Sequence, residues 1–470
     1  MKIKILNIDD PLIIKELAVI NQGFFADWEF TNTVDQADFI YDAQPDVTDK
    51  LAHLRVYLNQ LTKHFNQPQP WGLLNAMRPN KLVHSLKKRG LRDEKIRTAL
   101  QTEYLVSDEK VDLLLTVAKR QLAVIPDLYK LEGAVSLYLG IPFCPTRCAY
   151  CTFAAYAYAP NRKWVEPFLT ALHAEIELVG QYLRANKIPV TTIYLGGGTP
   201  TMLSVLELEN LLTAITTDIG ITREITVEAG RPDSLDEEKL ALLKKFQVNR
   251  ISINPQSFNQ ATLDLIGRHH TAESVKQQFA VAKQLDIANI NMDLIVGLPG
   301  EEQEELAYSL AQLKILQPES LTVHMLARKR KSELSKAEFT TGSPLAAVAP
   351  KTVLTEMAQM TYDFAAAAGY QPYYLYRQKN IAGNLENIGY GKPGYECQYN
   401  ILMMEEAQTI LGLGVGASSK FLIGQSVHNP KDLKTYIDSY AEYANRKLEL
   451  LKLSLQLDAK AFVYNEGNIN

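Results

Sequence analysis

The chain has 470 residues, of which 46% are hydrophobic and 22% charged, the composition of an ordinary globular protein with a large core. A formal net charge of −4 gives no general attraction to nucleic acid, so we expect no nucleic-acid partner. Residues 1–20 lack the apolar run of a secretion signal, and no window is apolar over the length of a membrane span. We therefore expect a cytoplasmic protein without a membrane span.

Residues 1–130 are predicted to form an α/β accessory domain. They open with the strand-like run KIKILNI and become mostly helical after Val47. A basic stretch between residues 78 and 97 carries many lysines and arginines and few acids. It is either a solvated helix face or a surface for an anion or a partner.

Residues 131–335 alternate between short apolar, β-branched runs and longer amphipathic segments. This alternation predicts an α/β fold, a parallel sheet with crossover helices that closes into a partial (β/α)6 barrel. The chemistry of such a barrel lies at the carboxyl ends of its strands. The predicted strands are residues 135–140, 191–196, 224–229, 249–254, 289–296 and 320–326.

Residues 336–470 are predicted to form a mainly helical C-terminal domain. Helical patterns such as PKTVLTEMAQMTYDFAAAAGY stand at its start, and helical patterns return near its end. Between them lies a loop rich in tyrosine, asparagine and glycine, YYLYRQKNIAGNLENIGYGKPGYECQYN.

Three of the four cysteines lie within the stretch IPFCPTRCAYC, directly after the first predicted strand. Four cysteines are too few for a disulfide framework in a chain of this length, so the crowding indicates metal or redox chemistry. A structural zinc site needs four ligands, usually as two pairs, and no histidine is near. The thiols of Cys144, Cys148 and Cys151 instead suit three corners of a 4Fe–4S cluster, whose fourth iron stays open to a small molecule.

Cys397, the fourth cysteine, lies far along the chain in the tyrosine-rich loop. A single cysteine is most often a small buried hydrophobic residue. A functional thiol near the site is the alternative.

Other polar or flexible residues also follow predicted strands. The second strand ends in the glycines of YLGGGTPT, which let backbone approach a ligand closely, and the third ends in Glu228. Gln256 follows the fourth strand, with Arg268 shortly after it. Asp293 stands inside the apolar fifth strand, where a carboxylate is costly unless it is paired. It either holds a ligand or forms a structural ion pair.

These motifs resemble those of the radical S-adenosylmethionine superfamily. The motifs IPFCPTRCAYC, YLGGGTPT, VEAGRPDSL, NPQSFN, IGRHHT and MDLIVGLPGE occur in the order found in the HemN family of oxygen-independent coproporphyrinogen III dehydrogenases. The stretches WGLLNAMRPNKLVH and YRQKNIAGNLENIGY resemble its HemZ type. The resemblance covers residues 133–425 well, and the first 130 residues do not look like those of the better-known HemN branch.

The resemblance implies two cofactors, a 4Fe–4S cluster and S-adenosylmethionine, the latter in two copies. The first S-adenosylmethionine would be held by Tyr138, Gly197, Glu228 and, in a loosely matching loop, Ser418, with Tyr138 and Glu228 also counted as catalytic. The second would be held by Tyr150, Gly198, Thr199, Gln256, Arg268, Asp293 and Ala327. Arginine and aspartate suit a ligand that carries both a carboxylate and an ammonium group.

The implied reaction is the oxidative decarboxylation of two propionates of coproporphyrinogen III, or a related tetrapyrrole, to vinyl groups. It would need a reductant such as flavodoxin or ferredoxin and an electron acceptor that the sequence does not identify. The carboxylates of the substrate need cations, and the candidates are Arg328, Lys329, Arg330, Lys331, Arg377 and Lys379. The run ARKRKS is equally well explained as a solvated loop. Tyr376, Gln378, Asn380 and Asn384 are expected to line the mouth or, for the tyrosine, to pack in the core.

Three alternatives stay open. A relative of the haem chaperone HemW would bind haem without this reaction, and its iron ligand would come from His269, His270, His324 or His428. Another radical reaction on a tetrapyrrole, such as methyl transfer or haem ring opening, would use the same cofactors. A zinc-stabilised module would have no radical chemistry.

Overall fold

The computed structural model describes residues 1–456 except 7, 9, 25–27, 32, 43–48, 75–76, 221, 328–331, 338–342, 348 and 379–384. The chain divides into two compact units, one formed by Met1–Lys119 and the other by Arg120–Val463. No helix of the described part is long and apolar enough to cross a membrane.

The first unit is an α/β structure, as predicted. Its parallel sheet has the order β2-β1-β3, and its core is made by residues such as Ile3, Leu17 and Tyr57. The basic stretch lies on α3 and α4, where Lys87 pairs with Asp93. The elements that begin in this unit are β1 (Lys2–Leu6), α1 (Pro11–Phe24), β2 (Glu29–Phe30), β3 (Phe39–Asp42), α2 (Lys50–Phe65), α3 (Asn80–Lys88), α4 (Asp93–Thr102) and α5 (Asp108–Val124).

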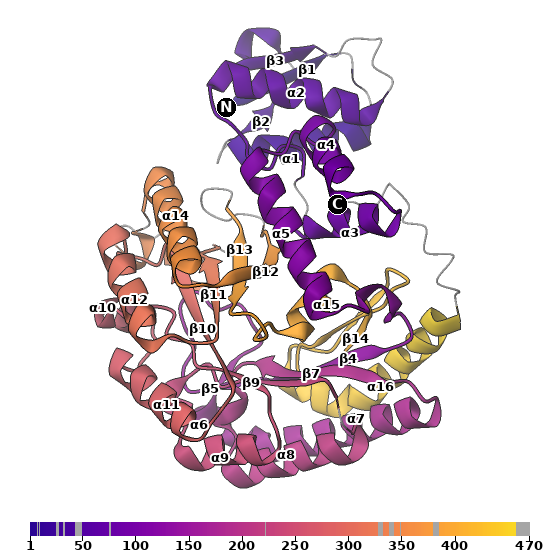
Figure 1. Ribbon diagram of the computed structural model, residues 1–470, viewed down its shortest axis with the longest axis vertical. Coiled ribbons are helices and arrows are strands. Elements are labelled where there is room, and N and C mark those ends of the chain that lie inside the picture. The colour runs from indigo at the N-terminus through magenta and orange to yellow at the C-terminus, as the bar shows by residue number, and fades with distance from the viewer. Residues whose placement is uncertain are drawn as a thin grey trace. The chain divides into compact units, whose positions relative to one another are not determined.

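The second unit contains the predicted partial (β/α)6 barrel. Six strands lie side by side in chain order and pair in parallel (Figure 1): β4 (Val135–Ile141), β7 (Val190–Gly197), β8 (Glu224–Glu228), β9 (Arg250–Ser252), β10 (Asn289–Val296) and β11 (Ser320–Met325). Helices connect them, namely α7 (Val165–Ala185), α8 (Val205–Asp218), α9 (Glu237–Lys245), α10 (Gln260–Leu265), α11 (Ala272–Gln284) and α12 (Gln303–Leu316). Each of the six strands coincides with one that the sequence predicts.

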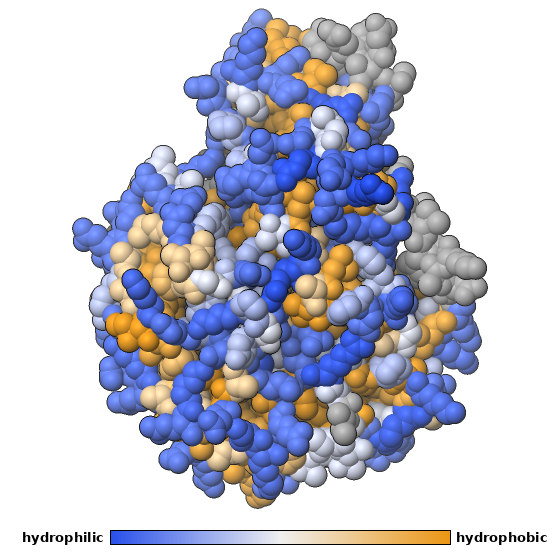
Figure 2. Space-filling model, viewed as in Figure 1, coloured by the Kyte–Doolittle hydropathy of each residue, from blue (hydrophilic) through white to orange (hydrophobic). Residues whose placement is uncertain are grey.

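Local sequence signals start several of these helices. Ser204 and Glu207 form a capping box at α8, and the side chain of Asp236 accepts a hydrogen bond from the backbone of Lys239 in α9. Hydrophilic side chains cover most of the visible face, with smaller hydrophobic areas between them (Figure 2). The buried side chains of helices such as α7 and α8 are mostly apolar, as expected for helix sides that pack against a sheet.

The C-terminal region is mainly helical, as predicted, but it also extends the sheet of the barrel. Its helices are α13 (Glu333–Ala337), α14 (Lys351–Ala367), α15 (Gln398–Glu405) and α16 (Leu433–Gln456). Its strands are β12 (Gln371–Tyr376), β13 (Asn387–Gly391), β14 (Thr409–Gly414), β15 (Ser418–Lys420) and β16 (Ser426–His428). Strand β13 pairs antiparallel with β11, and β14 pairs parallel with β4. The proposed boundary at residue 336 thus separates strands that are hydrogen-bonded neighbours.

A buried ion pair ties α7 and α16 to β14. The side chains of Glu175 and Lys447 are both fully buried and form a salt bridge. The Glu175 carboxylate also accepts hydrogen bonds from the backbone N–H of Gly414 (2.8 Å), the hydroxyl of Tyr436 (2.7 Å) and the amide of Asn429 (3.2 Å). A buried carboxylate is tolerated because each of these donors offsets its lost hydration.

The barrel is filled at the end where its strands begin. The carboxylate of Glu224, the first residue of β8, accepts the backbone N–H groups of Gln398 (2.7 Å) and Tyr399 (3.1 Å) at the start of α15. Arg250 and Tyr373 are buried beside it. An acidic side chain at a helix N-terminus satisfies backbone donors that otherwise have no partner.

Candidate functional site

The cysteine loop begins where β4 ends. Its first part, β5 (Phe143–Cys144), pairs with β6 (Tyr156–Ala157), so the segment between them folds back on itself. The backbone N–H of Cys151 donates to the carbonyl of Cys148 (3.0 Å). The hydroxyl of Thr146 donates to the carbonyl of Gly267 (3.0 Å), which fastens the loop to the segment after α10. The three cysteines are therefore held on one shaped loop at the carboxyl end of the barrel.

The pKa values of two thiols of this loop are raised above the ordinary value. Burial raises the pKa of the Cys144 thiol to about 11, although the hydroxyl of Thr199, 3.4 Å from its sulfur, acts in the opposite direction. Burial also raises the pKa of Cys151, and Cys148 adds to that rise. A metal that binds these sulfurs must displace their protons.

The glycine turn after β7 is hydrogen-bonded to the cysteine loop. The backbone N–H of Gly198 donates to the carbonyl of Ile141, and that of Thr199 to the carbonyl of Phe143, both at 2.7 Å. A Cβ atom on Gly198 would lie 2.6 Å from the Phe143 carbonyl oxygen, and Gly197 has a φ of +104°. Glycine is therefore required at both positions for this close approach.

Most side chains of the barrel strands are buried, and a few within them are partly exposed. Among these are Tyr138 on β4, Tyr194 on β7, Glu228 on β8, Asp293 on β10 and His324 on β11. Contacts join Tyr138, Tyr194 and Glu228 on one side and Asp293 and His324 on the other, and we name these five residues the lumen layer. The sequence predicted three of its members as site residues: Tyr138, Glu228 and Asp293.

Glu228 is the titratable centre of one half of the lumen layer. The hydroxyl of Tyr194 donates to its Oε1 at 2.6 Å. Burial raises the pKa of Glu228 to about 7, while the hydrogen bond from Tyr194 holds it lower than burial alone would. The ring of Tyr194 stacks on Tyr138, with centroids 6.1 Å apart, and on Tyr399 of α15, at 4.7 Å. The carboxyl group thus lies beside an aromatic wall and changes charge near neutral pH.

Asp293 is the centre of the other half. Its carboxylate accepts the amide groups of Asn254 (2.8 Å) and Asn291 (2.7 Å), and the Nε2 of His324 lies 3.7 Å away. Burial acts to raise the pKa of Asp293, but His324 and Asn291 hold it below its ordinary value. The other ring nitrogen of His324 lies 3.1 Å from the hydroxyl of Tyr376. Asp293 therefore stays an anion, and His324 is its partner in this structure.

Arg268 contacts the cysteine loop, and Gln256 is hydrogen-bonded to Asp293. The backbone N–H of Gln256 donates to the carbonyl of Asp293 (2.9 Å), and its side-chain Oε1 is buried without a hydrogen-bond partner. The guanidinium of Arg268 donates to two backbone carbonyls and lies 3.3 Å from the hydroxyl of Tyr150 and 3.9 Å from the sulfur of Cys148. An unpaired buried oxygen is costly, so the Oε1 of Gln256 is a suitable contact for a ligand.

Other residues that the sequence predicts for the site are not members of the lumen layer. The hydroxyl of Ser418 lies 2.8 Å from the Nδ1 of His428, and Ala327 directly follows the segment after β11. Arg377 is buried near Glu386, and burial lowers its pKa to about 10. The predicted residues Arg328, Lys329, Arg330, Lys331, Lys379, Asn380 and Asn384 lie outside the described residues.

Cys397 lies at the filled end of the barrel. It is fully buried, and its thiol donates to the carboxylate of Glu224 at 3.2 Å. Burial raises its pKa well above the ordinary value for a thiol. Because Glu224 and Glu228 are the first and last residues of β8, Cys397 is at the opposite end of that strand from the lumen layer. This is the setting of a structural cysteine.

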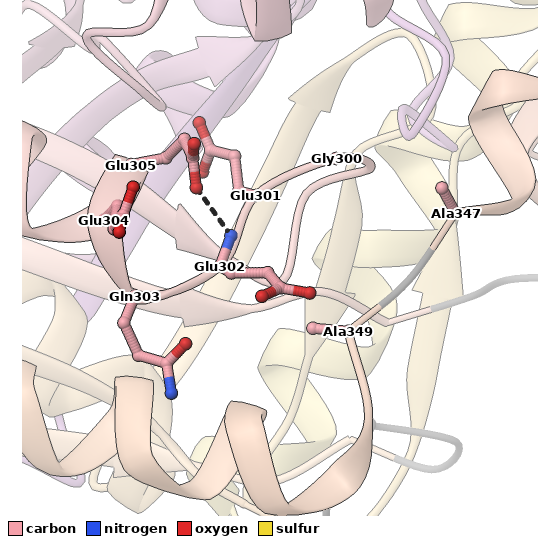
Figure 3. A pocket seen from close by; sticks show the side chains of 8 residues that line it. All are labelled: Gly300, Glu301, Glu302, Gln303, Glu304, Glu305, Ala347 and Ala349. Carbon is pink, nitrogen blue, oxygen red and sulfur yellow. Dashed lines mark hydrogen bonds between the residues drawn. The ribbon is translucent and has the colours of Figure 1, made fainter.

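An acidic hollow of about 470 Å³ lies at the N-terminus of α12 (Figure 3). It is lined by Gly300, Glu301, Glu302, Gln303, Glu304, Glu305, Ala347 and Ala349, and none of these is a predicted site residue. Glu305 accepts the backbone N–H of Glu302, and Glu301 accepts the hydroxyl of Ser257 (2.5 Å). Acidic residues are favourable at a helix N-terminus, which explains their presence here.

Three residues of the site were not found from the sequence. In the sequence, Tyr194 is part of a predicted strand, His324 is a candidate haem ligand only, and Arg231 is one residue of the motif VEAGRPDSL. The guanidinium of Arg231 lies 3.8 Å from the sulfur of Cys148. Contacts between strands that are far apart in the chain carry no signal in a single sequence.

Comparison with known proteins decides the family. Residues 138–313 match the Radical SAM superfamily. Over 423 residues the chain is 46% identical to the oxygen-independent coproporphyrinogen-III oxidase-like protein HemZ of Bacillus subtilis, an alignment that covers 87% of this chain and 83% of that protein. The chain belongs to the HemZ family of radical S-adenosylmethionine proteins.

Two further proteins are similar to this HemZ-family chain, one compared by sequence and one by structure. The haem chaperone HemW of Escherichia coli is 30% identical over 291 residues, which cover 61% of this chain and 70% of that protein. The structure of coproporphyrinogen III oxidase (HemN) from Escherichia coli shares the fold, with a TM-score of 0.55 and 24% identity over 69% of this chain and 72% of that chain. Membership in the radical S-adenosylmethionine superfamily implies a 4Fe–4S cluster and S-adenosylmethionine.

The residues of the cysteine loop fit a 4Fe–4S cluster. Three thiols lie on one loop, and the guanidinium groups of Arg231 and Arg268 lie 3.8 and 3.9 Å from the sulfur of Cys148. Among the described residues, no three acidic, cysteine or histidine side chains are gathered as they would be around a single metal ion. In a cubane cluster each cysteine binds a different iron. The cysteine sulfurs therefore lie farther apart than the ligands of a single metal ion.

Proposed function

We propose that this HemZ-family protein decarboxylates two propionates of coproporphyrinogen III, or a related tetrapyrrole, to vinyl groups, giving protoporphyrinogen IX. The observation that carries the proposal is the 46% identity to HemZ over 87% of the chain. The hydrogen-bonded unit of cysteine loop and glycine turn, with Glu228 in the neighbouring lumen layer, supports it.

Cys144, Cys148 and Cys151 would hold the cluster. Bound there, the cluster would supply the electron for reductive cleavage of S-adenosylmethionine, the source of the radical chemistry that would act on the propionates. The glycine turn keeps this loop closed against β7, so the chain itself limits the access of water and oxygen to the thiols.

The first S-adenosylmethionine would be held by Tyr138, Gly197, Glu228 and Ser418. The carboxylate of Glu228 suits hydroxyl or ammonium donors, and Gly197 lets the ligand approach the backbone. A second molecule would contact Tyr150, Gly198, Thr199, Gln256, Arg268, Asp293 and Ala327. Asp293, which stays an anion, suits the ammonium group of its methionine part.

The substrate would lie against the aromatic wall of Tyr138 and Tyr194, with Tyr376 beside it. Its carboxylates would be met by Arg328, Arg330 and Lys379. Arg377 is a weaker candidate because it is buried near Glu386. A reductant such as flavodoxin or ferredoxin would supply the electron that cleaves S-adenosylmethionine. A separate electron acceptor would take the electron that the substrate releases together with carbon dioxide.

The test is an anaerobic reconstitution followed by incubation with coproporphyrinogen III, S-adenosylmethionine and a reductant. Mass spectrometry should show a product that has lost two carboxyl groups. A product that gains a carbon would instead identify methyl transfer, and an opened macrocycle would identify haem ring opening. Unchanged substrate in a protein with intact cluster would contradict the decarboxylation.

Haem binding without turnover is the second candidate, favoured by the 30% identity to HemW. Both ring nitrogens of His324 already face partners, Tyr376 and Asp293, and His270 is buried. His428 is exposed, but its ring nitrogens lie 2.8 and 3.1 Å from the hydroxyls of Ser418 and Ser426. His269 is also exposed and would be the available iron ligand of the four. Tight haem binding that a His269→Ala change removes would support this candidate.

The binding of S-adenosylmethionine is expected to depend on pH through Glu228. Its pKa is raised to about 7, so the carboxylate, which accepts hydrogen bonds, is lost as the pH falls below that value. Tyr194→Phe removes a hydrogen bond that lowers this pKa, so the inflection should move to higher pH. A rise of about one pKa unit would lower the carboxylate fraction at pH 7 from about one half to about one tenth, so we expect the affinity at pH 7 to fall about fivefold.

Equilibrium dialysis with labelled S-adenosylmethionine between pH 6 and 9 would measure this. Tyr399→Phe is the matched control, because it keeps a stacked ring on Tyr194 without touching the hydrogen bond to Glu228. An unchanged pH profile in Tyr194→Phe would exclude Glu228 as the titrating group.

A further inference from the structure

Arg231 is a buried cation that faces the cysteine loop. It is 3% exposed, and its Nε and Nη2 donate to the two carboxylate oxygens of Asp233 at 3.0 and 2.8 Å. Its remaining nitrogen, Nη1, lies 3.3 Å from the hydroxyl of Thr146 and 3.8 Å from the sulfur of Cys148. Two hydrogen bonds to one carboxylate fix the orientation of the guanidinium group. Its Nη1 is therefore held toward the sulfur of Cys148.

The turn that carries Arg231 is itself fixed. The hydroxyl of Ser234 donates to the carbonyl of Arg231 at 2.7 Å and lies 2.6 Å from the hydroxyl of Thr201. The ammonium group of Lys239 donates to the carbonyl of Ser234 at 2.9 Å. Arg231 therefore has little freedom to turn away from Cys148.

The charges around Cys148 do not balance within the protein. The Nη1 of Arg268 also lies near this sulfur, at 3.9 Å, and its other terminal nitrogen donates to backbone carbonyls. Among the described residues, Asp233 is the only carboxylate that contacts either guanidinium, so one positive charge is in excess there. Buried charges are costly unless an opposite charge is near. A thiolate-bound cluster, which is negatively charged, would supply it.

We propose that Arg231 raises the reduction potential of the cluster by placing a fixed positive charge and an N–H donor at the sulfur of Cys148, with Asp233 holding it in position. Reduction adds a negative charge, so a neighbouring cation stabilises the reduced form. Charge, hydrogen bonds to sulfur and exposure are the means by which proteins set the potentials of such clusters. The inference rests on the cluster of the proposed function but not on its tetrapyrrole substrate.

The test is a redox titration of the reconstituted protein, followed by electron paramagnetic resonance of the reduced cluster. In Arg231→Met, we expect the equilibrium constant for one-electron reduction to fall at least tenfold, which lowers the midpoint by about 59 mV or more. Arg231→Lys keeps the charge and should shift less. Asp233→Asn removes a negative charge and should shift the midpoint in the opposite direction.

Arg223→Met is the matched control. Arg223 also forms a fork with an aspartate, Asp127, at 2.6 and 2.9 Å, but both side chains are largely exposed and neither contacts a cysteine. Its midpoint and iron content should equal those of the parent protein. Iron and labile sulfide are measured in every variant, so that midpoints are compared only between loaded proteins.

Equal midpoints in all loaded variants would overturn the inference. So would a shift of the same sign in Arg231→Met and Asp233→Asn, because that would indicate a disturbed loop and not a charge effect. If Arg231→Met takes up no iron, the other two variants still test the inference. The midpoint should fall slightly in Arg231→Lys and rise in Asp233→Asn. A parent protein without iron would overturn the cluster itself, which is a separate failure from equal midpoints.

Discussion

Cys148→Ala should lose its iron, its labile sulfide and its turnover together, and Cys397→Ala should keep all three. Cys148 is one of the three thiols on the loop that the carboxyl ends of β4 and β7 hold in place. A cubane cluster with two remaining thiolates has lost one of its protein anchors and is open to solvent and oxygen. Activity should fall to the level of a protein-free control.

The comparison with Cys397 makes this test specific. Both thiols are buried, but that of Cys397 bonds Glu224 at the opposite end of β8 from Glu228. Glu224 keeps two backbone donors in the variant, so we expect a loss of about 1–3 kcal/mol in stability and no loss of iron. Iron and sulfide analysis with the visible absorption spectrum measures the outcome. Iron retained in Cys148→Ala, or lost from Cys397→Ala, would show that the ligands are assigned wrongly.

Lys447→Met should lower the free energy of unfolding by about 3–5 kcal/mol, because it leaves the buried carboxylate of Glu175 without its cation. The double variant Lys447→Met with Glu175→Gln removes both charges and should recover much of this loss. Thermal unfolding followed by circular dichroism at pH 7 would measure the change.

Lys434→Met is the control for this pair, since Lys434 bonds Asp438 on the exposed face of the same helix, α16. An exposed pair of this kind contributes little, so its melting temperature should not change measurably. Lys447→Met that is as stable as the parent would mean that Gly414, Tyr436 and Asn429 suffice to solvate the carboxylate.

The barrel itself could be read from the sequence. The predicted run 289–296 has the same bounds as β10, and the prediction 135–140 differs from β4 by one residue. These strands are buried on both faces, so they appear as continuous apolar runs between amphipathic helices. The strands β12, β13 and β14 were not predicted. Runs such as QPYYLY and NIGYG are rich in tyrosine and glycine, and only their neighbours in the sheet make them strands.

The single motifs of the candidate site can be predicted from the sequence, but the contacts between them cannot. The cysteine run, the glycine turn and Glu228 each follow a strand, which is a local signal. That Tyr194 bonds Glu228, or that Arg231 reaches Cys148, depends on which strands are adjacent and how they are staggered. The roles of the substrate-binding cations stay predictions, since Arg328, Arg330 and Lys379 lie outside the described residues.

The filled end of the barrel has a consequence for inhibition. The described residues Glu224, Arg250, Cys397 and Tyr373 are buried there, so side chains fill this end of the barrel. We expect reactants to reach Glu228 from the other end, where the cysteine loop lies, and products to leave from that end. A compound that binds beside the cysteine loop should therefore compete with every reactant. It should also block the release of reaction products from the barrel.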